Sequence, residues 1–181
     1  MAFKPIFKVC CFLMIIFFTS PASAVEWFVG LELPTNYTFK NADDGTALDP
    51  DGSPSGFLLS AHMTEYSVGA ILESYEISLK DSGDSKISRT LIDLYYVTPI
   101  PYVQVSVGGG YGFSEVKGTY AGDYDQGAAL QYLLRLGFMV SDSIEIHWNY
   151  RMIQSRIKLK NSDNLLETGG TMTSLGASIG F

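Results

Sequence analysis

The chain has 181 residues, of which 46% are hydrophobic and 18 are glycine, and its formal net charge is -7. This length favours a single domain. The chain is acidic overall and has no cluster of basic residues of the kind on which nucleic-acid binding depends. Beyond the N-terminal segment, no apolar run reaches the ~20 residues that a membrane-spanning helix needs, so a helical membrane protein is excluded.

The N-terminal segment has the features of an export signal. Lys4 and Lys8 precede the apolar run 9–18, and small residues close the segment. A basic start, an apolar stretch too short to span a bilayer and a small-residue end are typical of a secretory signal peptide. We therefore expect residues 1–24 to be the signal peptide and residues 25–181 to form one exported domain.

The cysteines and histidines limit the chemistry of the exported chain. Both cysteines, Cys10 and Cys11, lie inside the predicted signal peptide, so we expect neither a disulfide nor thiol chemistry after export. Only two histidines, His62 and His147, remain as soft ligands, and they do not make a zinc constellation. We expect no catalytic residue, metal or cofactor.

An alternation of period two begins at Glu26 and runs to Leu33, which predicts a first strand that ends at Pro34. Residues 34–57 are rich in Asn, Asp, Gly and Pro and are predicted to form one long surface loop. Within this loop, residues 49–53 weakly resemble a calcium loop but lack its spacing and its closing Glu. A solvated acidic turn is favoured, and loose divalent-cation binding is the alternative.

Three further strands are predicted before the centre of the chain. The second covers Thr64 to Leu72, and Glu73 and Ser74 are expected to form a short turn into a third strand with apolar residues at 75, 77 and 79. Residues 81–86 form a polar loop, and residues 89–96 then alternate again as a fourth strand.

Two prolines between residues 98 and 101 are expected to break the sheet, because proline cannot donate a hydrogen bond to a neighbouring strand. The fifth strand covers residues 103–113 and carries Gly108, Gly110 and Gly112 on its inner side. Glycine at this density lets a curved sheet bend and leaves room for large interior side chains. Residues 115–125 form the next polar loop.

The longest pattern runs from Gln126 to Lys160, with a break at residues 141–143. Large apolar side chains alternate with small or polar ones on both sides of this break. The apolar series comprises Leu130, Tyr132, Leu134, Leu136, Phe138 and Val140, then Ile144, Ile146, Trp148, Tyr150 and Met152. A period of two sustained this far around a short turn predicts a long antiparallel hairpin with one apolar face.

The polar face of this hairpin distinguishes a soluble sheet from a membrane barrel. A solvent-exposed face usually carries many Lys and Glu, whereas this face is mainly Gly, Ser, Ala and Gln with isolated charges such as Arg135, Glu145 and Arg151. Small and charge-compensated groups suit a narrow polar interior, and the apolar face suits hydrocarbon. The hairpin is therefore predicted to be two strands of a transmembrane β-barrel.

The last loop is predicted at residues 161–169, and the last strand runs from Thr171 to Phe181. The total is about eight strands, with short turns alternating with long polar loops, as in an up-and-down outer-membrane barrel with short periplasmic turns and long extracellular loops. In this pattern the mature chain resembles the small outer-membrane β-barrel superfamily, the OmpA-type and OmpX-type barrels and the opacity-protein relatives. Its final strand, with Leu175, Ile179 and Phe181 at alternate positions, is similar to the signal that this superfamily presents to the barrel-assembly machinery.

An eight-stranded barrel is only wide enough to be filled by its own side chains. The polar residues expected to face inward are Glu32, Glu76, Arg89, Asp93, Gln104, Arg135, Glu145, His147 and Arg151. A compensated network that plugs the interior is favoured, because buried charge is tolerated only when it is paired. A gated ion-selective path is the alternative.

The resemblance implies a non-enzymatic integral protein of the outer membrane, with acidic surface loops and an envelope-structural or surface-interaction role. The alternatives are a narrow channel for small or apolar solutes like the OmpW-type barrels, a soluble lipocalin-like barrel and a lipid A-modifying enzyme. The last is disfavoured because His147 faces inward without a nearby serine. The expected partners are outer-membrane lipid and lipopolysaccharide, the barrel-assembly machinery and an extracellular ligand or host surface.

Overall fold

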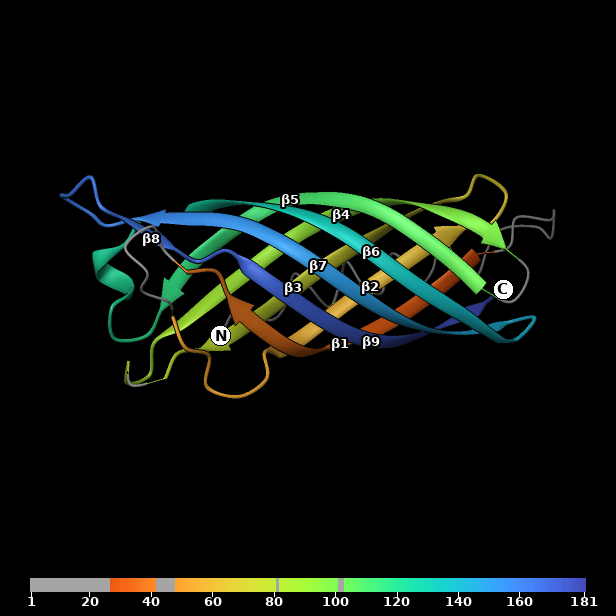
Figure 1. The fold of residues 1–181 in the computed structure, drawn as a ribbon, viewed down its shortest axis with the longest axis horizontal. Helices are drawn as coiled ribbons and strands as arrows, with labels where there is room; N and C mark the ends of the chain where they lie inside the picture. The colour runs from red at the N-terminus through yellow and green to blue at the C-terminus, as the bar shows by residue number, and fades with distance from the viewer. Residues whose placement is uncertain (1–26, 42–47, 81, 101–102) are drawn as a thin grey trace, which may run out of the picture.

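The computed structural model describes residues 27–41, 48–80, 82–100 and 103–181 (Figure 1). The predicted signal peptide lies outside these residues. Nearly all the described chain is β-strand, and none of its helical segments is long and apolar enough to cross a bilayer.

Long strands form the wall of the molecule. Their bounds are β1 (Trp27–Phe39), β2 (Ser55–Met63), β3 (Val68–Ser78), β4 (Lys86–Ile100), β5 (Val103–Lys117), β6 (Gly127–Ser141), β7 (Ile144–Lys158) and β9 (Gly170–Gly180). A short strand, β8 (Leu165–Glu167), pairs with the end of β7, and a single 3-10 turn, η1 (Ala121–Asp123), lies between β5 and β6.

Each long strand pairs antiparallel with its neighbour in the chain, and β1 pairs with β9 to close the sheet. At the seam, the amide of Phe181 donates to the carbonyl of Trp27 at 2.8 Å. The prediction of an eight-stranded antiparallel up-and-down barrel is therefore confirmed.

The direction of the side chains agrees with a membrane barrel. Leu134 is 38% exposed and Ile146 50% exposed on the outer wall, whereas Arg135 is 2% exposed and Arg151 fully buried inside. Exposed apolar side chains continue around every long strand, and a belt of this size is characteristic of a surface that contacts lipid.

The first strand is longer than predicted. Pro34 does not end β1, which continues to Phe39 after a register shift between Pro34 and Asn36. A bulge accommodates a residue that has no amide donor. Tyr37 and Phe39 consequently point into the barrel instead of belonging to a loop.

The predicted turn at Glu73 and Ser74 is wrong. The turn lies at residues 64–67, β2 occupies residues expected to be loop, and β3 runs unbroken through Glu73. The inner face of β3 carries Ile71, Tyr75 and Ile77, all buried. In the other strands the apolar side chains were expected on the outer face, whereas in β3 several of them lie on the inner face. The alternation of residues therefore suggested a turn at a place where the strand is continuous.

The two ends of the barrel differ as predicted. The described parts of the long loops, residues 40–41, 48–54, 79–80, 82–85, 118–126 and 159–169, gather at the end that carries β8 (Figure 1). The short turns 64–67 and 142–143 lie at the other end with the C-terminus (Figure 1). Strands extend further into these connections than expected, since β4 reaches Ile100 beyond Pro99 and β5 reaches Lys117. The tip of the β4–β5 hairpin, residues 101–102, lies outside the described residues.

Candidate functional site: the filled barrel interior

Three layers of side chains fill the inside of the barrel, and we name them from the short turns outward. The turn-end layer consists of Phe28, His62 and Tyr95, each at most 3% exposed. The rings of Phe28 and His62 stack with centroids 4.9 Å apart, and Tyr95 meets His62 edge-on at 6.4 Å. Gly69 lies under the Tyr95 ring, where any Cβ would collide with it. These three rings obstruct the periplasmic end of the interior.

The middle of the barrel holds buried charges, which we call the ionic layer. Its members are Glu32, Glu73, Asp93, Gln131, Arg135, Glu145, His147, Asn149, Arg151 and Ser174, all at most 2% exposed. They come from β1, β3, β4, β6, β7 and β9 and so connect opposite walls of the barrel.

One half of the ionic layer surrounds Arg135. Its Nη2 donates to Glu145 Oε1 at 2.8 Å, and its Nη1 donates to Glu32 Oε1 at 3.4 Å. His147 lies between the same carboxylates, with Nδ1 3.2 Å from Glu145 Oε1 and Nε2 3.5 Å from Glu32 Oε1. Each carboxylate in this half therefore has cationic or imidazole groups on more than one side.

The other half surrounds Arg151. This residue donates to Glu32 Oε2 at 2.8 Å, to Glu73 Oε1 at 2.5 Å and to Ser174 Oγ at 2.6 Å. Gln131 Nε2 donates both to Glu73 Oε1 at 3.1 Å and to Asp93 Oδ2 at 2.8 Å. Arg151 thus ties β7 to β1, β3 and β9 across the barrel.

The loop-end layer is centred on Arg89. Its Nη1 donates to Tyr37 Oη at 2.6 Å, its Nε to Ser114 Oγ at 3.0 Å, and its Nη2 to the carbonyl of Thr168. The guanidinium also lies over the Tyr37 ring, 4.8 Å from the centroid. Buried apolar side chains complete this layer: Phe39, Leu58, Tyr75, Ile77, Leu79, Ile87, Val116 and Ile157.

Most of the polar residues predicted to face inward do so. Glu32, Arg89, Asp93, Arg135, Glu145, His147 and Arg151 are all buried inside the barrel. Gln104 is half-buried outside the ionic layer, with its Nε2 3.6 Å from Met139 Sδ.

Glu76 does not belong to the interior. It lies on the outer side of β3, where it pairs with Lys86 at 3.4 Å and Lys117 at 3.1 Å. Because the turn was predicted at the wrong place, the side chains of β3 after residue 74 were assigned to the wrong faces of the sheet. The same error concealed Glu73, which the uninterrupted alternation of β3 would have placed inside.

Glycines provide the room for this interior, as predicted from their density in the fifth strand. A Cβ at Gly110 would overlap Asp93 Oδ1, and one at Gly176 would collide with His147 Nε2. Small residues on the wall therefore allow large charged groups from the adjacent strands to cross the barrel.

His147 has a serine nearer than the sequence suggested, since Ser178 Oγ lies 3.5 Å from its Nδ1. Ser178 is 1% exposed and His147 fully buried, so a substrate carbonyl cannot approach this pair. Among the described residues, no group of three or more His, Cys, Asp or Glu side chains could hold a metal ion.

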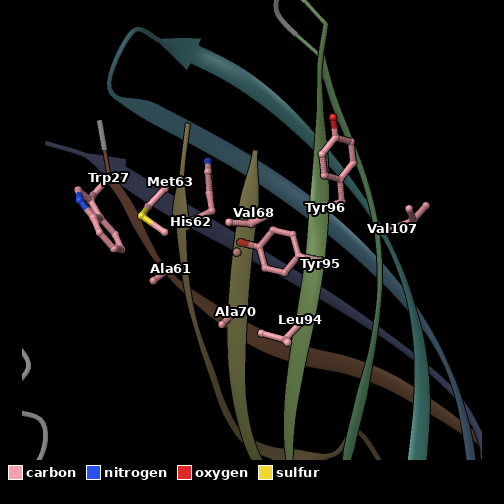
Figure 2. Close-up of a pocket in the computed structure, with 11 residues that line it drawn as sticks. Trp27, Ala61, His62, Met63, Val68, Ala70, Leu94, Tyr95, Tyr96 and Val107 are labelled. Atoms are coloured by element: carbon pink, nitrogen blue, oxygen red, sulfur yellow. The ribbon is translucent and has the colours of Figure 1, made fainter. Parts of the chain in front are cut away.

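An apolar pocket of about 660 Å³ lies on the wall at the turn end (Figure 2). Its lining includes outer-wall residues such as Trp27, Ala61 and Tyr96, together with His62 and Tyr95 of the turn-end layer. It belongs to the outer belt, and its apolar lining suits hydrocarbon in preference to a polar substrate.

The acidic residues of the first loop that the structure describes are exposed at the loop end of the barrel. Asp49 and Asp51 lie on the surface, and the amide of Asp51 donates to the carbonyl of Ser78 at 2.8 Å, which ties the first loop to the end of β3. Asp43 and Asp44 lie outside the described residues. The loops 118–126 and 159–169 are also joined, since the amide of Lys160 donates to the carbonyl of Asp123 at 2.7 Å.

Solved structures of outer-membrane barrels share this fold. Neisserial surface protein A is 13% identical, with a TM-score of 0.57 over 90% of this chain and 100% of its own. Ail of Yersinia pestis, solved in complex with the heparin analogue sucrose octasulfate, is 18% identical, with a TM-score of 0.55 over 88% of this chain and 100% of its own. Outer membrane protein W of E. coli is 10% identical, with a TM-score of 0.54 over 89% of this chain and 100% of its own.

A comparison with curated protein sequences finds no match. The family model for the outer membrane protein beta-barrel domain matches residues 10–181, which include every strand of the barrel. The lipid-facing belt, the closed antiparallel sheet and this match agree on the location of the protein in the outer membrane. The chain belongs to the outer membrane protein beta-barrel domain family.

Proposed function

We propose that the protein is a non-enzymatic barrel that anchors a set of acidic extracellular loops in the outer membrane, with an envelope-structural or surface-interaction role. The observation that carries this proposal is the filled interior. Ring stacking at the turn end, cross-barrel ion pairs in the middle and apolar packing at the loop end leave a barrel of this size without an aqueous path.

Planar-bilayer recording of the refolded mature protein tests the anchor role against a channel. We expect the current to stay at baseline. Stepwise conductance of the wild-type protein would favour the narrow channel instead. Unchanged lipid A mass spectra on overexpression would agree with a non-enzymatic role, and altered lipid A would contradict it.

The loops are the surface on which a partner would bind. In each of the four long loops acidic residues outnumber basic ones. A polyanion such as the sulfated ligand bound by Ail would be repelled by this surface, so a cationic or neutral ligand on the outside is favoured. We expect immobilised heparin to retain no protein at physiological salt, whereas salt-sensitive retention would contradict this polarity.

The outer belt and the last strand of the barrel indicate the partners in the membrane. We propose that the belt contacts phospholipid and lipopolysaccharide. Leu175, Ile179 and Phe181 all lie exposed on the outer side of β9 or just beyond it, which supports their role as the signal for the barrel-assembly machinery. Less assembled barrel in cells after Phe181→Ala, with normal refolding in vitro, is the expected result.

A further inference from the structure

The ionic layer contains more carboxylates than cations. Glu32, Glu73, Asp93 and Glu145 are all fully buried, and the guanidinium groups among them belong to Arg135 and Arg151 alone. Uncompensated charge in the interior of a membrane barrel is strongly unfavourable. The surplus must therefore be neutralised within the layer.

The surplus is not spread evenly. Glu32 and Glu145 each contact Arg135 and His147, and Glu32 also contacts Arg151. Arg135 and the imidazole of His147 therefore both lie against these two carboxylates. The remaining cation, Arg151, contacts Glu73 but makes no ion pair with Asp93.

In the part of the chain that the structure describes, Asp93 makes no ion pair, and the side chain that donates to it is a neutral amide. Its Oδ2 accepts from Gln131 Nε2 at 2.8 Å, and the same amide nitrogen serves Glu73 Oε1. One amide nitrogen therefore lies within 3.1 Å of both carboxyl groups, which stand on the paired strands β3 and β4. The second oxygen of each, Asp93 Oδ1 and Glu73 Oε2, is buried and has no other donor.

Two carboxylates can hydrogen-bond to each other only when one of them carries a proton, because ionised carboxylates are acceptors only. Carboxyl pairs this close share one proton, since both cannot ionise side by side. We propose that Glu73 and Asp93 hold one proton between them, so that the pair bears a single negative charge, which Arg151 balances.

The surroundings favour a proton over a metal ion. Asp93 Oδ1 already occupies the space above Gly110, where no Cβ would fit. Among the described residues no set of three ligating His, Cys, Asp or Glu side chains is available. A proton needs no additional volume, whereas a cation needs several oxygen ligands around it.

The pair is enclosed by titratable groups on several strands. Toward it face Arg151 from β7 and, through Arg151, Glu32 from β1. Arg135, His147 and Glu145 form the other half of the layer, and Tyr75 with Arg89 lies on the loop side. The direct ion pairs of Arg151 go to Glu32 and Glu73, so loss of the shared proton at alkaline pH leaves a second buried negative charge without an ion pair of its own.

Infrared spectroscopy of the refolded mature protein in lipid bilayers tests the shared proton. We expect the carbonyl stretch of a protonated carboxylic acid at neutral pH, and its loss in both Asp93→Asn and Glu73→Gln. Glu145→Gln is the matched control, because Glu145 is equally buried but paired to Arg135, and the band should persist in it. A wild-type spectrum without this band, or a band that survives both substitutions, would overturn the proposal.

Thermal unfolding gives a second readout. Asp93→Asn keeps the shape of a protonated aspartate, so it should fold and should melt at least as high as wild type at neutral pH. Because the folded barrel holds a proton that the unfolded chain releases, wild-type stability should fall as pH rises, and Asp93→Asn should fall less. If exchanging sodium for a larger cation at fixed pH shifts the wild-type melting temperature instead, the site holds a metal cation and the proton is excluded.

Discussion

At the residue scale, Arg151 links two buried carboxylates, since it forms ion pairs with Glu32 and Glu73 at once. Arg151→Met would leave the buried Glu73 without its cation and remove one of the two arginines that contact Glu32. Breaking a buried ion pair costs about 3–5 kcal/mol, so we expect the free energy of unfolding in lipid to drop by about that amount. Urea titration of the reconstituted barrel measures it.

The matched control is Lys158→Met, which removes an exposed pair with Asp163. Exposed pairs contribute less than about 1 kcal/mol, so this variant should unfold close to wild type. Equal losses in the two variants would mean that the ionic layer does not stabilise the barrel.

A glycine provides a second test at this scale. Gly110→Ala places a methyl group where Asp93 Oδ1 lies, and the carboxyl group would have to move away from Gln131. We expect a clear loss of stability or a failure to refold. Gly122→Ala, with no atom within 4 Å of the new methyl, should be neutral, and a neutral Gly110→Ala would contradict the account of glycine spacing.

At the element scale, the outer belt predicts a penalty for charge. Ile92 lies near the middle of β4 and is 60% exposed on the outer wall. Arginine at the bilayer midplane of a barrel costs about 2–4 kcal/mol, so Ile92→Arg should lower folding stability in lipid by that amount. Tyr120→Arg, in the loop after β5 and 50% exposed, should cost little. Similar costs at both sites would place Ile92 in water.

The elements also show what the sequence could and could not predict. The hairpin of β6 and β7 was predictable because its inner face is polar and its outer face apolar along most of its length. In β3 the inner face carries the apolar side chains of Ile71 and Ile77 on either side of Glu73, so a rule that assigns apolar residues to the outer face fails there. The prediction that the first strand ends at Pro34 was wrong for a different reason, because a bulge lets a strand continue past proline.

The same distinction applies to the site. Inward charges such as Arg135 and Glu145 follow from alternation alone, but their pairing depends on the cross-barrel register, which no local pattern contains. The ion pair between Glu73 and Arg151 could therefore be identified only from the closed three-dimensional structure.

At the scale of the whole molecule, the apolar belt and the filled interior together indicate that lipid surrounds the barrel and that water does not pass through it. Residues 25–181 contain no cysteine, so single cysteines introduced into a protein of these residues can carry spin labels without interference. Outer positions Leu130, Leu134 and Phe138 and inner positions Ala129 and Leu133 alternate along β6.

The most direct test is therefore the accessibility of spin labels at these five positions of the barrel in bilayers to oxygen and to a water-soluble nickel chelate. Labels at the outer positions should collide strongly with oxygen, which concentrates in hydrocarbon, and labels at the inner positions should collide weakly with both reagents. Nickel accessibility at Ala129 and Leu133 equal to that of a loop label, or oxygen accessibility without a period of two, would contradict the lipid-facing, closed barrel.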